Sequence, residues 1–255
     1  MMNNSIFIFS HQDDEFGVYE LIRSLVLKNN NVIIIYLTSG QIYNKIPKNK
    51  VFKRDEESLR VLSLMGIKKK NIIFLGRKKN IPTCLLYKKL DLAYIHLKKI
   101  IKNLKGSVQI ITHAWEGGNE DHDSCYAIVK KIISNSKNVN SAFQFPLYNS
   151  FNKSFFYSVQ APLKTNGKLL KVKSKFSNRL KFIMYLFFYK SQLKVWIGLY
   201  PFLIFNYLFR DFVYLQRIDK KYIIKKPHKG LLLYERFRNL EFNIVKKYIV
   251  KFYNS

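Results

Sequence analysis

Apolar runs alternate with helical periodicities along the first half of the chain. Short runs rich in Ile, Val and Phe predict buried strands at residues 5–9, 32–37, 72–75 and 108–112. Between these runs, apolar residues recur at helical spacing over residues 16–28, 50–65 and 90–104. Strands that alternate with helices predict an α/β fold, with a mostly parallel sheet and helices on both faces.

The pattern after Pro146 is less regular. Residues 155–172 fit either strands or loop, and residues 180–215 are apolar on most faces, which we interpret as two helices. We expect a further strand at residues 230–234 and a helix at 240–251. A length of 255 residues suits one domain. We therefore expect a single domain over residues 1–255, with a core at 1–148 and a helical C-terminal elaboration at 149–255.

Composition and charge narrow the choice of partners. A hydrophobic fraction of 48% excludes a disordered chain. The net charge of +29 would attract nucleic acid, an anionic membrane surface or a phosphate-bearing substrate. Alternatively, the lysines reflect genome base composition and only solvate the surface. Nucleic acid is the weakest of these partners, because the lysines are spread along the chain without a groove-reading helix or an aromatic RNA-binding motif.

The longest apolar run, residues 195–209, is interrupted by Pro201 and Asn206 and is shorter than the ~20 residues that span a bilayer. It predicts a core or interfacial segment. The longer apolar, aromatic stretch at residues 182–209 predicts either a buried helix pair or a segment that lies on an anionic membrane. Cys84 and Cys125 have neither pairing nor metal-site spacing, and the N-terminus has no cationic and apolar leader pattern. We therefore expect a reduced, cytoplasmic protein, with peripheral membrane contact as the open alternative.

Two polar segments follow the first and fourth predicted strands. The first is His11-Gln12-Asp13-Asp14-Glu15, and the second is Glu-Gly-Gly-Asn-Glu-Asp-His-Asp at residues 116–123. In a doubly wound sheet these strand ends are neighbours where the strand order reverses, so the segments should meet. Together they offer two imidazoles and a carboxylate, a frequent catalytic zinc set. Alternatively, the acids of the first segment only cap a helix.

The first segment supplies His11 with either Asp13 or Asp14, and the second supplies His122. One acid would then remain free beside the metal. Such a carboxylate can accept the proton of a water that attacks an amide carbonyl. The Gly-Gly pair of the second segment allows a sharp turn and a close approach of the backbone.

Both segments resemble the signatures of the PIG-L/LmbE-like family of zinc-dependent amino-sugar deacetylases, which are His-Pro-Asp-Asp-Glu and Gly-Gly-His-Pro-Asp-His-Asp. Thr38-Ser39-Gly40, Arg54-Asp55-Glu56-Glu57 and Leu64-Met65-Gly66 also match the family pattern. The resemblance covers residues 5–148 well. It implies a Rossmann-like fold and one zinc ion per chain.

Residue by residue, the resemblance makes His11, Asp14 and His122 the zinc ligands and Asp13 the general base. It places Arg54 on the substrate side, where a guanidinium can bind sugar hydroxyls or a phosphate. The alternative for Arg54 is an exposed ion pair with Glu57. We also expect Glu116 and Asp123 to contact the substrate.

This sequence departs from the family pattern at two positions. Gln12 replaces a proline that does not bind metal, so we expect little consequence. Asn119 replaces a His that faces the reacting carbonyl, and an amide can donate a hydrogen bond but carries no positive charge.

The resemblance implies an N-deacetylase that acts on an N-acetylhexosamine of a glycoconjugate or of its nucleotide- or lipid-linked precursor. The alternative is a zinc-binding homologue with impaired catalysis that serves as a binding or scaffold protein, and Asn119 favours it. The sequence does not indicate an oligomeric state.

Overall fold

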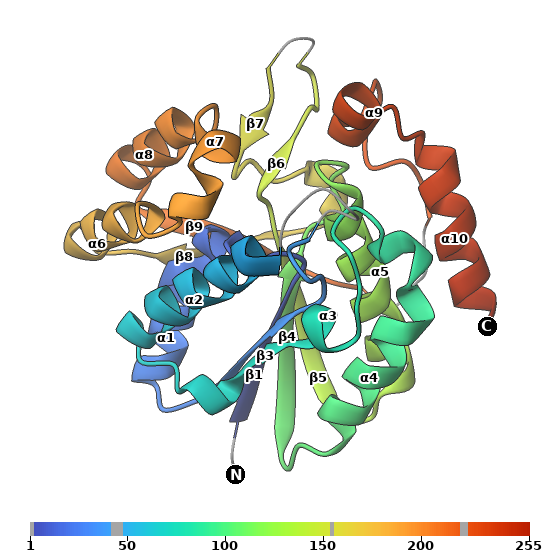
Figure 1. Cartoon of the computed structure of the whole chain (residues 1–255), viewed down its shortest axis with the longest axis horizontal. Helices are drawn as coiled ribbons and strands as arrows, with labels where there is room; N and C mark the ends of the chain where they lie inside the picture. Colours follow the sequence, from blue (N-terminus) through green and yellow to red (C-terminus); the bar gives the residue numbers. More distant parts are fainter. Residues whose placement is uncertain (1–2, 42–47, 154–155, 220–223) are drawn as a thin grey trace.

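The computed structural model describes residues 3–41, 48–153, 156–219 and 224–255. Its main sheet has seven strands in the order β3-β2-β1-β4-β5-β9-β8 (Figure 1). These strands are β1 Asn3–Phe9, β2 Asn31–Tyr36, β3 Ile72–Phe74, β4 Ser107–His113, β5 Val139–Phe145, β8 Leu169–Lys173 and β9 Phe212–Arg217. A separate pair is formed by β6 Tyr148–Asn149 and β7 Ser158–Val159.

The order of the strands positions the two polar segments. β1 pairs in parallel with β2 on one side and with β4 on the other. The chain therefore moves outward from β1 to β3 and then returns to the opposite side of β1, so the strand order reverses between β1 and β4. Because the segments follow β1 and β4, they meet at this switch point, as predicted.

Helices cover both faces of the sheet. The longer ones are α1 Tyr19–Leu27, α2 Lys48–Leu64, α4 Leu90–Lys102, α5 Glu120–Asn135, α6 Phe176–Leu186, α8 Tyr200–Phe209 and α10 Phe242–Asn254. The short ones are α3 Leu75–Lys78, α7 Leu193–Trp196 and α9 Leu233–Arg238, with 3-10 turns at Asp14–Val18, Lys69–Asn71, Leu86–Lys88, Lys164–Asn166 and Lys190–Gln192.

Side chains that alternate along β1 divide the core into two layers. Ile6 and Ile8 pack with α4, α5 and α10 on one face. Phe7 and Phe9 pack with α1, α2, α6 and α8 on the other. Burial on both faces explains the unbroken apolar runs of the parallel strands. The prediction of an α/β Rossmann-like fold is confirmed, together with a C-terminal part that adds helices.

Three expectations for the later part of the chain are wrong or incomplete. Residues 230–234 do not form a strand, because helix α9 begins at Leu233. The backbone N–H of Leu233 donates to the backbone oxygen of Gly117 (2.9 Å), and the backbone N–H of Leu232 donates to the Glu235 carboxylate (2.8 Å). Residues 212–215 belong to strand β9 rather than to a second helix. Helix α5 and strand β5 were not predicted. Among the described helices, none is both long and apolar enough to cross a membrane.

Candidate metal centre and active site

A cavity of about 420 Å³ lies over the switch point between β1 and β4. Its wall includes residues of both polar segments, such as His11, Asp13 and Asn119. The C-terminal part contributes Trp196 and Tyr234 to the same wall. The helical elaboration therefore completes the site instead of lying apart from it.

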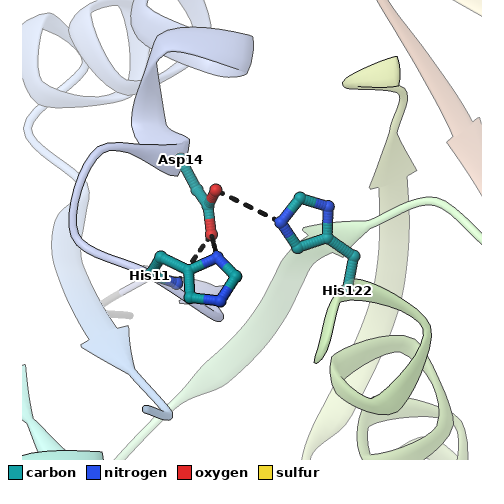
Figure 2. A group of neighbouring side chains, drawn as sticks. All are labelled: His11, Asp14 and His122. Carbon is teal, nitrogen blue, oxygen red and sulfur yellow. Dashed lines mark hydrogen bonds and ion pairs between the residues drawn. The ribbon is translucent and has the colours of Figure 1, made fainter. Parts of the chain in front are cut away.

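The side chains of His11, Asp14 and His122 point toward one another, as Figure 2 shows, and His11 and Asp14 line the cavity. Each offers one ligand atom, and these three atoms lie within 4.8 Å of one another. Asp14 lies between the two rings, with Oδ1 3.3 Å from Nε2 of His122 and Oδ2 3.5 Å from Nδ1 of His11. The set predicted from the resemblance is thus brought together by the fold, and its assignment as the ligand set remains a prediction.

The state of His122 fits a metal site. Its ring is completely buried, Nδ1 has no hydrogen-bond partner among the described residues, and Nε2 has the Asp14 carboxylate 3.3 Å away. Burial, with a smaller effect of His113, lowers the pKa of His122 to about 3. A neutral buried imidazole that keeps one nitrogen without a partner and the other beside a carboxylate is suited to binding a cation. The His-Asp-His cluster can therefore hold a divalent metal ion.

His11 has a carboxylate partner behind it. Nε2 of His11 lies 3.0 Å from Oδ2 of Asp121, which leaves Nδ1 on the side of Asp14. Burial alone would lower the pKa of His11, but Asp14 and Asp121 together raise it to about 10. A carboxylate on the outer nitrogen of a histidine fixes its ring orientation and strengthens it as a ligand. Metal binding must displace the His11 proton.

Asp13 lies beside the cluster in a strained conformation. Its φ is 127°, a region that non-glycine residues rarely adopt, and such strain is often found at functional sites. Both carboxylate oxygens are held: Oδ1 accepts from Arg54 (3.3 Å), and Oδ2 accepts from Nε1 of Trp196 (3.1 Å). Burial raises the pKa of Asp13 to about 7 despite the adjacent Arg54 guanidinium.

Arg54 is buried and points into the site. Its guanidinium donates to the backbone oxygens of Gly40 and Gln12 as well as to Asp13. The alternative ion pair with Glu57 is absent among its described contacts, because Glu57 accepts from Ser191 instead.

Gln12 also has a definite role in the loop that carries His11. Its side chain is completely buried and donates to Asp55 at 2.7 Å. A proline at this position could not make that bond. Gln12 therefore adds a hydrogen bond between the loop and helix α2 where the family has a proline. Gln12 is not part of the metal cluster.

Asn119 is the N-cap residue of α5. Its Oδ1 accepts from the backbone N–H of Asp121 (2.8 Å), and its amide also hydrogen-bonds the hydroxyl of Tyr148. Tyr148 lines the cavity, with its ring centroid 5.4 Å from that of His122. A Cβ at Gly118 would lie 2.0 Å from the backbone oxygen of Tyr148, so glycine is required for this approach.

Glu116 and Asp123 do not lie on the cavity wall, unlike the expectation of substrate contact. The Glu116 carboxylate accepts from the backbone N–H groups of Leu147 and Tyr148, and burial raises its pKa to about 8. Asp123 accepts from the backbone N–H groups of Glu116 and Gly117. These two carboxylates hold the loop after β4 in place, so we assign them a structural role instead of substrate contact.

Sequence reasoning missed three residues of the site: Asp121, Tyr148 and Trp196. Asp121 lies next to His122 in the second motif, so its position was a usable signal. Tyr148 and Trp196 come from segments without a recognisable motif, and only the packing of the C-terminal part brings them to the cavity.

Comparisons with known proteins identify the family of the chain. The model of the PIG-L family, described as GlcNAc-PI de-N-acetylase, matches residues 6–133, about half of the chain. No curated protein matches the chain. In open α/β sheets, ligands bind at the switch point, where this site lies. The chain belongs to the PIG-L family of de-N-acetylases, which are amide hydrolases.

Solved structures share the fold at low sequence identity. The zinc-inhibited form of teicoplanin deacetylase Orf2 is 12% identical with a TM-score of 0.62, covering 86% of this chain and all of its own. N,N'-diacetylchitobiose deacetylase from Pyrococcus horikoshii is 16% identical with a TM-score of 0.62, covering 84% and 83%. The hydratase GalB from Pseudomonas putida is 14% identical with a TM-score of 0.51, covering 88% and 99%. At these identities the likeness shows the fold alone.

Proposed function

We propose that this protein is a zinc-dependent N-deacetylase that hydrolyses the acetamide of an N-acetylhexosamine. The substrate would be a glycoconjugate or its nucleotide- or lipid-linked precursor. One observation carries the proposal: His11, Asp14 and His122 converge at a cavity whose wall also presents the carboxylate of Asp13. Membership of a family of de-N-acetylases supports it.

We assign one zinc ion per chain to His11, Asp14 and His122. Neutral imidazoles and a carboxylate are donors that zinc prefers, and Asp121 orients His11 from behind. When bound, zinc would supply a Lewis acid for the acetamide carbonyl and for the attacking water. The residues described next would supply the proton transfers and the hydrogen bonds.

Asp13 is our candidate for the general base. A base with a pKa near 7 is well matched to neutral conditions, and burial raises the pKa of Asp13 to about 7. Hydrogen bonds from Arg54 and Trp196 fix the orientation of its carboxylate. Asp13 would take the proton of the attacking water and then deliver it to the leaving amine, so that no second acid is required.

Tyr148 is our candidate for the donor that stabilises the tetrahedral oxyanion. Asn119, which stands where the family has a His, uses its amide to cap α5 and to hold the Tyr148 hydroxyl. If the Asn119 amide N–H donates to this hydroxyl, as we propose, the hydroxyl proton is left to donate into the cavity. We therefore assign catalysis to Tyr148 and a positioning role to Asn119, which revises the direct role that the resemblance implied.

The rest of the cavity wall suits a sugar with an anionic group. Tyr148, Tyr157 and Trp196 provide aromatic surfaces for a sugar ring, and Arg54 and Arg238 provide cations. A guanidinium can bind sugar hydroxyls or a phosphate by paired hydrogen bonds. The net charge of +29 would attract the same phosphate. We propose a cytoplasmic location, which the free thiols of Cys84 and Cys125 support.

A second function is favoured by the absence of an imidazole at Asn119. In this second function, the protein binds zinc and an N-acetylated sugar but has impaired catalysis, and it serves as a binding or scaffold protein. Acetate release from N-acetylglucosamine and from its nucleotide- and lipid-linked forms separates the two functions, with Asp13→Asn as the blank. Release above the blank supports the deacetylase. Zinc-loaded protein that binds these sugars but releases no acetate from any of them would establish the binding function instead.

A further inference from the structure

Helix α8 is apolar on both of its faces. Its sequence, Tyr-Pro-Phe-Leu-Ile-Phe-Asn-Tyr-Leu-Phe, contains no charged residue. Leu203 and Tyr207 are buried against the body of the protein, whereas Phe205 is 61% exposed and Phe209 is 72% exposed. A helix that is hydrophobic all round is usually buried in a core or in a membrane. Because one face of α8 is exposed, this helix has an apolar surface that the described part of the chain does not cover.

Neighbouring residues extend this surface. We define the apolar face as Phe187, Ile197, Phe202, Phe205 and Phe209, all of which are exposed. Two ring contacts lie at this face: Phe187 stacks on Tyr200 at the start of α8 with centroids 5.5 Å apart, and Phe205 contacts Phe209 at 4.7 Å. Figure 1 shows α6, α7 and α8 grouped at one corner of the molecule. Several large exposed apolar side chains on neighbouring elements are typical of an interaction site.

The chain segment that carries the apolar face is rich in lysine and arginine. Residues 124–210 contain fourteen Lys and Arg residues and no Asp or Glu. Lys175, Lys181 and Lys190 are exposed on α6 and at its two ends. Aromatic residues flanked by lysines suit the interface of an anionic bilayer, where the rings enter the headgroup region and the cations meet lipid phosphates.

The apolar face leads to the active-site cavity. Phe202 contacts Tyr157 with ring centroids 6.1 Å apart, and Tyr157 contacts Tyr148 at 6.4 Å. Tyr157 and Tyr148 line the cavity, and Tyr148 lies against His122. In addition, α7 and the following turn expose Ile197 outward while Trp196 faces the cavity. The same short segment thus forms a cavity wall and part of the apolar face.

We propose that the apolar face docks on an anionic membrane surface and holds the cavity mouth at the level of the lipid headgroups. A second copy of the chain fits the face poorly, because residues 124–210, which carry the face, contain no Asp or Glu to pair with the fourteen Lys and Arg residues of the same segment in the other copy. Delivery of a lipid-linked sugar to the cavity rests on the proposed function, whereas membrane docking itself does not.

Flotation of the zinc-loaded protein with vesicles tests the proposal. Vesicles of phosphatidylcholine mixed with phosphatidylglycerol should bind the protein, and binding should fall with added salt. Phosphatidylcholine alone should bind it far more weakly. The double variant Phe205→Ser, Phe209→Ser should lower the partition coefficient by about tenfold or more, because two exposed aromatic rings no longer enter the interface.

A matched control is the double variant Ile95→Ser, Ile244→Ser. It removes two exposed apolar side chains from α4 and α10, which cover the other face of the sheet, and should leave vesicle binding unchanged. Absence of binding to the anionic vesicles, or equal loss in both double variants, overturns the proposal. So does a dimer in solution that Phe205→Ser, Phe209→Ser dissociates. Acetate release from water-soluble N-acetylglucosamine reports separately on the deacetylase, since it needs no membrane.

Discussion

The Asp121 carboxylate lies 3.0 Å from Nε2 of His11, although the two residues are 110 positions apart in the chain. The same carboxylate accepts backbone hydrogen bonds from Cys84 and Leu86. The orientation of His11 is therefore fixed by a group that is itself held rigidly. A preformed ligand needs little reorganisation when a metal binds.

Asp121→Asn should weaken zinc binding by about 10–100-fold, which is the usual effect of losing a carboxylate that hydrogen-bonds the outer nitrogen of a histidine ligand. Competition with a chelator of known affinity measures this change. Asp123→Asn is the matched control, because it alters a completely buried carboxylate of the same helix that has no contact with His11 among the described residues. Equal loss of zinc affinity in both variants would mean that general damage to α5 is responsible.

Asp13→Asn should keep zinc and lower the rate of acetate release by about a hundredfold or more, because an amide cannot accept the proton of the attacking water. Zinc content and turnover measured on the same sample separate the two effects. Near-normal turnover in this variant would assign the base to another residue. Loss of zinc would make Asp13 part of the ligand set.

Tyr148→Phe should lower kcat by about 10–100-fold with little change in KM, as expected when a hydrogen bond made chiefly in the transition state is lost. Tyr157→Phe is the control, since it removes a second cavity hydroxyl that has no contact with Asn119 among the described residues. Equal turnover in wild type and Tyr148→Phe would remove Tyr148 from the mechanism.

Gly118→Ala should destabilise the protein by about 1–3 kcal/mol, because the added Cβ would meet the rigid backbone oxygen of Tyr148 at 2.0 Å. Urea denaturation measures the free energy of unfolding. Gly198→Ala is the control, because its Cβ would meet only the hydroxyl of Tyr157, at 3.3 Å. Equal stability of both variants would show that the loop after β4 moves freely to admit a side chain.

The N-terminal half of the fold could be predicted because its strands are buried on both faces. Burial of this kind requires continuous apolar runs, and Ile6 and Phe7 pack into opposite layers of the core. The convergence of His11 and His122 followed from topology, because the ends of parallel strands meet at the switch point.

The C-terminal part could not be predicted in the same way. The apolar residues at 231–234 look like a strand, but their backbone N–H groups bond to Gly117 and Glu235 instead of to a sheet. The contacts of Trp196 with Asp13 and of Tyr148 with Asn119 depend on packing between segments far apart in sequence. No local pattern encodes such contacts.

We expect acetate release to require a metal ion held by His11, Asp14 and His122. The most direct test is to strip the protein with a chelator and then measure acetate release from the best N-acetylated sugar during a zinc titration. We expect no release without metal and a rate that rises until one zinc ion is bound per chain, with His122→Ala inactive and metal-free throughout. Undiminished release from the stripped protein, or full zinc binding by His122→Ala, would contradict the account.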